Sequence, residues 1–258
     1  MGEKKKKVEE KKKRTTGWRL VLWGLALTIW IGAVLIGVQF LSALFVSRVL
    51  IKPGIVDVAY LASPTGTMIY QAVIYVLSLT IAILLPWKVL KMRTSREELG
   101  LEGLPTWTDI LLGPIGFVLS TIFAMGAVTV MEKILPSVDW EEAQNVGYDV
   151  LVSGKDYLLA FIALVVIAPI CEEILFRGWL YGKLRSRMKA LPAILLTSLM
   201  FGIVHLQWNV GVTVFVMSVF MCIMRELTGA IYSGIILHMI KNGLAFYLLF
   251  MSVPFLQY

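Results

Sequence analysis

The stretch YLLAFIALVVIAPICEEILFRGWLY, residues 157–181, decides the class of this protein. It is long enough and apolar enough to cross a bilayer, which takes about 20 mostly apolar residues in a helix. It nevertheless carries three ionisable side chains, Glu172, Glu173 and Arg177. Charged groups are costly inside a membrane. The stretch therefore predicts a transmembrane helix whose charges have a structural or functional role.

The rest of the chain repeats this pattern. Six further apolar stretches predict an all-α, polytopic transmembrane bundle of about seven spans: 18–46, 67–87, 107–131, 191–206, 210–224 and 230–251. Only 16% of the residues are charged, against about 25% in an ordinary soluble domain. The fifth and sixth spans are short and are separated only by Gln207, Trp208 and Asn209. A single re-entrant hairpin is the alternative for these two.

Basic residues set the expected orientation. The formal net charge of +7 is concentrated in the run 4–14 and in clusters beside the apolar stretches. This is the pattern of cytoplasmic membrane flanks, and it excludes a nucleic-acid-binding stripe. Clusters follow the second, fourth and sixth spans, so the N-terminus is expected in the cytoplasm and the C-terminus outside it. Arg48 and Lys52 in the first loop weaken this inference slightly.

The pattern divides the chain into five segments. We expect a basic cytoplasmic tail at 1–16, N-terminal transmembrane helices and loops at 17–135, and an acidic extracytoplasmic loop at 136–156. A catalytic transmembrane core at 157–251 and a C-terminal tail at 252–258 complete the chain. The apolar stretch after the basic run is too long for the core of a signal peptide, so it predicts an uncleaved anchor. The expected location is the cell membrane.

Few ionisable groups lie inside the predicted spans. Both histidines of the chain, His205 and His238, do, and so does Lys241; the amide of Asn242 lies there too. At about 1.5 Å per helical residue, counting from the expected cytoplasmic ends puts Glu172 about 14 Å deep, His205 about 21 Å and His238 about 12 Å. The hydrocarbon core is about 30 Å thick. A carboxylate, two histidines and an amide at similar depth are hard to explain by packing alone. Lys241 is expected to snorkel or to face a water-filled cavity.

Spacing suggests different roles for the two glutamates. Glu173 and Arg177 are four residues apart and can pair on one helix face, which predicts a structural ion pair. Glu172 is rotated by about 100° from Glu173 and has no partner one turn away, which suits a general base. His238 and Asn242 are also four residues apart and share a face. Taken singly, the histidines could be ordinary core residues and Asn242 a helix–helix contact.

Three motifs resemble those of one family. Glu172-Glu173-Ile-Leu-Phe-Arg177 resembles EExxxR, Phe201-Gly-Ile-Val-His205 resembles FxxxH, and His238-Met-Ile-Lys-Asn242 resembles HxxxN/D. These are motifs of the CPBP family, the CAAX proteases and bacteriocin-processing enzymes. They occur here in the same order, and the resemblance covers roughly residues 95–245. It implies an intramembrane endopeptidase. The HExxH zinc motif of another class of intramembrane protease does not occur in the sequence.

Peptide hydrolysis needs an activated water and stabilisation of the oxyanion. We expect Glu172 to act as general base, His205 to position the water, and His238 and Asn242 to donate to the oxyanion; the resemblance implies the same positions. No cofactor is required in this interpretation, and the partners are membrane lipid and a membrane-associated peptide or protein substrate. One alternative is a zinc ion held by Glu172, His205 and His238. The other is a non-catalytic immunity or transport protein with a buried proton relay.

Overall fold

The computed structural model describes residues 17–142, 144, 146–148 and 151–251. The predicted tails 1–16 and 252–258 lie outside the described residues. Six helical segments are long and apolar enough to cross a membrane: Gly17–Ile51, Pro64–Leu90, Trp107–Ile134, Gly154–Arg185, Trp208–Thr228 and Tyr232–Phe250. A further apolar helix, Ala190–Ile203, is shorter. The predicted all-α helix bundle is confirmed, and the chain is a multi-pass membrane protein.

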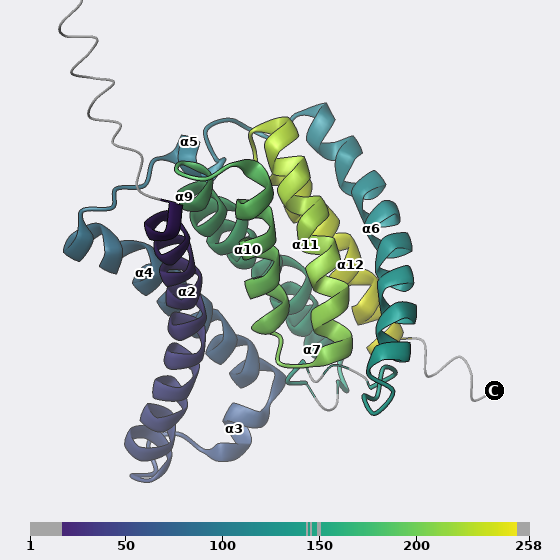
Figure 1. Cartoon of the computed structure of the whole chain (residues 1–258). Helices are drawn as coiled ribbons and strands as arrows, with labels where there is room; N and C mark the ends of the chain where they lie inside the picture. Colours follow the sequence, from purple (N-terminus) through teal and green to yellow (C-terminus); the bar gives the residue numbers. More distant parts are fainter. Residues whose placement is uncertain (1–16, 143, 145, 149–150, 252–258) are drawn as a thin grey trace, which may run out of the picture.

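The first half of the chain supplies helices to both sides of the bundle (Figure 1). Its elements are α2 (Gly17–Phe45), η1 (Val46–Ile51), α3 (Val58–Ala62), α4 (Pro64–Leu90), α5 (Arg96–Leu99) and α6 (Trp107–Ile134). The second half begins with one continuous helical segment made of α7 (Gly154–Phe161), η2 (Ile162–Ile167), α8 (Ala168–Glu173), η3 (Ile174–Leu180) and α9 (Tyr181–Arg185). It continues with α10 (Ala190–Ile203), α11 (Trp208–Thr228) and α12 (Tyr232–Phe250). The η elements are π-helical.

Local sequence explains where the helices begin and end. Thr106 and Asp109 form a capping box that starts α6, and Ser153 with Asp156 starts α7 in the same way. Gly229, with φ of 73°, ends α11 in the left-handed conformation, which glycine adopts without strain. The predicted span 210–224 is wrong in its bounds, because Trp208 and Asn209 already belong to α11.

The helices α10 and α11 are separate and antiparallel (Figure 1). Asn209, at the start of α11, donates to the backbone carbonyls of Trp140 and Glu142, so the turn between the two helices lies beside the loop that follows α6. A Cβ atom on Gly202 would lie 2.8 Å from the carbonyl oxygen of Gly211. The two backbones therefore approach closely because neither position carries a side chain. At about 1.5 Å per residue, α10 is about 21 Å long.

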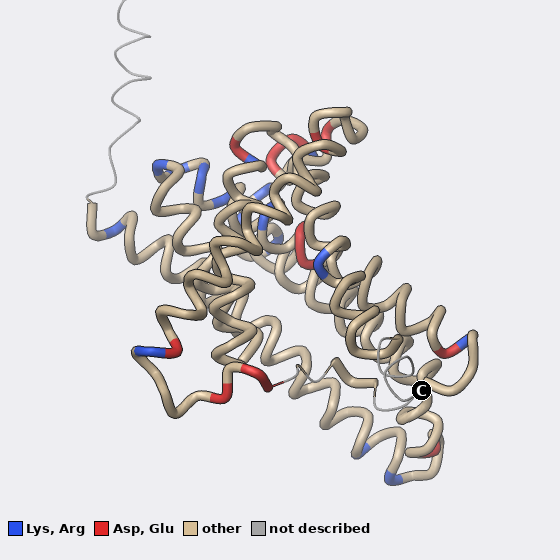
Figure 2. The backbone as a smooth tube through the Cα atoms, turned by 90° about the vertical axis from the view of Figure 1, so that its right-hand side faces the viewer, with Lys and Arg blue, Asp and Glu red and all other residues tan. Residues whose placement is uncertain are grey.

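Charged residues are concentrated in the connections and near helix ends, and long uncharged stretches of helix lie between them (Figure 2). At the end of the bundle near α5, Lys183 pairs with Glu98 at 2.7 Å. There Arg225 also donates to the carbonyls of Glu97 and Glu98. Basic residues that the sequence places on the cytoplasmic side thus meet at one end.

The orientation itself stays a prediction. A reporter that works only outside the cytoplasm should be active when fused after Tyr258, and one that works only in the cytoplasm should be inactive there. The reason is that seven spans put the two termini on opposite sides, and the basic run 4–14 retains the N-terminus inside. The measurement is the activity of paired reporters, one that works only in the cytoplasm and one that works only outside. A C-terminal reporter active only in the cytoplasm would contradict N-in, C-out and would favour the re-entrant hairpin.

The core surrounds η3. Phe176, Trp179, Leu180, Phe201 and Leu237 are almost completely buried. Large apolar side chains on the outer faces are exposed, among them Leu111, Ile115, Val118, Ile122 and Phe123 of α6. A contiguous apolar surface of this kind suits contact with lipid. Of the polar residues of the candidate site, Glu173, Arg177 and His238 are buried inside the bundle, whereas these apolar side chains face outward.

Candidate active site

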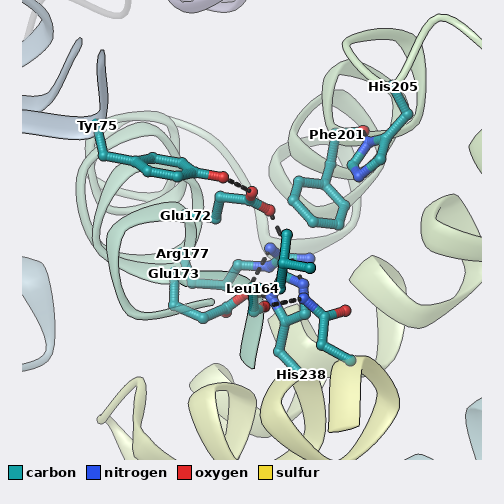
Figure 3. A network of polar contacts seen from close by, with 9 residues as sticks. Tyr75, Leu164, Glu172, Glu173, Arg177, Phe201, His205 and His238 are labelled. Carbon is teal, nitrogen blue, oxygen red and sulfur yellow. Dashed lines mark hydrogen bonds and ion pairs between the residues drawn. The ribbon is translucent and has the colours of Figure 1, made fainter. Parts of the chain in front are cut away.

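Two adjacent glutamates end α8 and point to different partners (Figure 3). Glu173 is fully buried, and its Oε1 lies 2.8 Å from Nη1 of Arg177 on η3. The structure therefore joins the two residues that the sequence pairs. Arg177 also lies over the ring of Phe201, with 4.2 Å from its guanidinium carbon to the ring centroid. Buried charges persist when they are paired, and Arg177 has both an anion and an aromatic face.

Glu173 has a second contact that the sequence does not reveal. Its Oε1 lies 3.1 Å from Nδ1 of His238 on α12. A carboxylate accepts, so the ring nitrogen donates. A Cβ atom on Gly234 would lie 2.8 Å from Oε2 of Glu173. The helix α12 thus comes close enough for the histidine contact because position 234 has no side chain. Glu173 links η3 to α12 and orients the ring of His238.

Glu172 is the accessible carboxylate of the pair. Its side chain is 21% exposed, against 0% for Glu173. Its Oε1 accepts a hydrogen bond from the hydroxyl of Tyr75 on α4 at 3.1 Å, and its Oε2 lies 3.8 Å from Nε2 of His238. Tyr75 was missed by sequence reasoning: a tyrosine inside an apolar span carries no motif. Glu172 is thus held from one side and approached by a histidine on the other.

The ring of His205, in the segment after α10, is held by a backbone carbonyl one helical turn earlier. Its Nδ1 lies 2.7 Å from the carbonyl oxygen of Phe201. Because a carbonyl oxygen only accepts, the proton of the neutral ring is on Nδ1 and the lone pair is on Nε2. Within the described part of the chain, no hydrogen bond or ion pair joins His205 to Glu172.

The ring of Phe201 separates the two histidines. Its centroid lies 5.0 Å from that of His205 and 5.8 Å from that of His238, both in edge-to-face geometry. In Figure 3, Phe201 lies between Glu172 and His205. The first residue of the FxxxH motif therefore sets the spacing within the site.

Asn242 makes a different contact from the one expected. Its Nδ2 donates to the carbonyl of Leu164 at 2.8 Å, which ties α12 to the π-helical η2. One of the two amide N–H groups is thereby occupied, and the other is left for a different acceptor. Among the contacts of the described residues, none joins Asn242 to His238 or to Glu172.

The donor set of the zinc alternative is not assembled. Among the residues that the structure describes, no three His, Cys, Asp or Glu side chains are placed to hold a metal ion. Glu172 and His238 approach one another at 3.8 Å, but the ring of Phe201 stands between His238 and His205. As placed, Glu172, His205 and His238 do not fit a zinc ion, whose ligands lie about 2.0–2.2 Å from the metal.

Comparison with known proteins bears on the segment that carries these residues. Residues 154–244 match the family model described as type II CAAX prenyl endopeptidase Rce1-like. The chain is 24% identical to the UPF0177 protein YxdF of Lactococcus lactis subsp. lactis (strain IL1403) over 129 residues, which are 50% of this chain and 67% of that protein. No solved structure matches the chain. The predicted family resemblance is confirmed, and at family level it supports a hydrolase of the intramembrane CAAX-protease type.

Proposed function

We propose that this multi-pass membrane protein is an intramembrane endopeptidase that hydrolyses peptide bonds of membrane-associated peptides or proteins, with Glu172 as its general base. The observation that carries the proposal is the contrast between the adjacent glutamates. Glu173 is fully buried and bound to Arg177 and His238, whereas Glu172 is partly exposed beside the same histidine. Only Glu172 is accessible to a water molecule and a substrate.

In this proposal Glu172 removes a proton from the water as its oxygen bonds to the peptide carbonyl carbon. His205 positions the same water by accepting a hydrogen bond from it at Nε2. The lone pair is on Nε2 because the carbonyl of Phe201 keeps the ring proton on Nδ1. When the C–N bond breaks, the protonated Glu172 delivers its proton to the leaving amine. Tyr75 holds one oxygen of Glu172 and limits the carboxylate to one orientation.

His238 stabilises the oxyanion in this proposal. Its Nδ1–H is committed to Glu173, so Nε2 faces Glu172 at 3.8 Å. A protonated Nε2 is a charge-assisted donor for the developing oxyanion, and the remaining N–H of Asn242 is the second donor.

Cleavage by the purified protein should persist under strong chelation, because the proposed reaction uses Glu172 and two histidines and no metal. The measurement is the rate of peptide-bond cleavage in detergent by mass spectrometry, before and after treatment with a chelator and then with added zinc. A Glu172→Gln preparation purified in the same way excludes a contaminating protease. Activity lost with the chelator and restored by zinc would favour the zinc alternative.

A further inference from the structure

Lys241 is a charged residue that the proposed mechanism does not use. It is the tenth of the nineteen residues of α12, so at about 1.5 Å per residue it lies about 14 Å from either end of the helix. Over residues 17–142, 144, 146–148 and 151–251, the side chain of Lys241 takes part in no hydrogen bond or ion pair. An ionisable residue at the middle of a membrane helix is costly and marks a functional site unless it is paired.

Lys241 lines a cavity of about 480 Å³ between α6, α11 and α12. This volume falls in the range of about 300–1,000 Å³ typical of ligand sites. Among the described residues that line it, Lys241 alone is charged. Hydroxyls in the same wall already donate to backbone carbonyls: those of Ser120 and Thr121 to Phe117, and that of Thr213 to Asn209. The donors that remain in this lining are the ammonium of Lys241, which has three N–H groups, and the side-chain amide of Gln144, which has two; of these only the ammonium is charged.

The cavity adjoins the candidate active site. Lys241 lies between His238 and Asn242 on the same helix, α12. No direct ion pair joins Lys241 to Glu172 in the described residues. The lysine thus lines the cavity and lies about one helical turn from His238, whose Nε2 is 3.8 Å from Glu172.

We infer that this cavity is a substrate subsite and that Lys241 binds a carboxylate of the peptide there. This inference rests on the proposed function. The carboxylate is the C-terminal one or that of an acidic side chain, since an ammonium recognises both as a point charge. Lipid headgroups lie at the ends of the membrane helices, about 14 Å from this depth. A peptide that extends to the position of cleavage, by contrast, brings its carboxylate to the middle of the membrane.

The test uses three amphiphilic probes on the full-length protein in detergent: N-octanoyl-trialanine with a free carboxylate, its C-terminal amide, and an amide with aspartate as the middle residue. Dissociation constants are measured for the wild type and for the uncleaving Glu172→Gln protein. At least one acidic probe should bind about 10- to 100-fold more tightly than the neutral amide, as expected for a hydrogen bond to a charged group. The acidic probe that binds more tightly than the neutral amide identifies the source of the carboxylate.

Lys241→Met should abolish this preference and leave the melting temperature equal or higher, because it removes an unpaired charge. Lys133→Met, at the exposed end of α6, is the matched control and should keep the preference. Any one of three results would overturn the inference. The wild type could bind acidic and neutral probes equally, the preference could survive in Lys241→Met, or that variant could fail to fold. Tighter binding of phosphatidylglycerol than of either acidic peptide would overturn it in favour of a lipid site.

Cleavage measured on the same wild-type samples separates the two proposals. Lysine-dependent carboxylate binding without any peptidase activity would refute the proposed function and leave the carboxylate site. Cleavage without a carboxylate preference would refute the subsite and leave the proposed function.

Discussion

Replacing Glu172 with glutamine should lower peptide-bond cleavage by about 100- to 10,000-fold, the typical contribution of a general base. The amide keeps the size of the side chain and can still accept from Tyr75, so the fold should be retained. Glu172 is partly exposed and has no cationic partner whose charge would be left unpaired, apart from the 3.8 Å approach of His238. The measurement is cleavage rate and melting temperature on the same detergent samples.

The adjacent position is the matched control for this result. If Glu172→Gln kept near-normal activity while Glu173→Gln stayed folded but inactive, the roles assigned to the two carboxylates would be reversed.

Glu173→Gln should destabilise the protein by about 3–5 kcal/mol, because it leaves Arg177 as a buried charge without its anion. Both side chains are completely buried, and the same oxygen of Glu173 also accepts from His238. The change should therefore reduce the yield of folded protein and its melting temperature. Glu226→Gln removes a carboxylate from a largely exposed pair with Arg185 and should change stability by about 0–1 kcal/mol.

The double change Glu173→Gln with Arg177→Met separates stability from orientation. It should recover part of the lost stability, since no unpaired charge remains. Cleavage should stay low, because an amide oxygen accepts from His238 less strongly than a carboxylate does. Orienting partners of functional histidines are worth about 10- to 100-fold where they have been measured in metal sites. A Glu173→Gln protein that melts like the wild type would refute the structural part of this account.

Much of the fold follows from the sequence because membrane helices are limited by length and polarity. The long apolar stretches predict the bundle, and the four-residue spacing of Glu173 and Arg177 predicts their pairing. Helix ends are less certain: α11 begins at Trp208, which the sequence places in a connecting segment. The apolar pattern pauses at Gln207-Trp208-Asn209, but Asn209 is accommodated in the helix because its amide bonds the loop after α6.

The contacts within the site were less predictable because they join distant parts of the chain. Tyr75 and Glu172 are separated by 97 positions, and no periodicity reports such a contact. The second contact of Glu173 depends on how α12 packs, which Gly234 permits. The amide of Asn242 also bonds the carbonyl of Leu164, in a π-helical segment whose geometry the sequence pattern does not reveal; its expected role as an oxyanion donor stays a prediction.

The central claim is that Glu172 makes this membrane protein a peptidase. Its most direct test compares the peptide N-termini newly formed in membranes that contain equal amounts of the wild-type protein or of Glu172→Gln. The account predicts a defined set of new N-termini on membrane-associated proteins in the wild-type membranes, absent with the variant and unchanged by chelation. Identical sets of N-termini in the two membranes would contradict it.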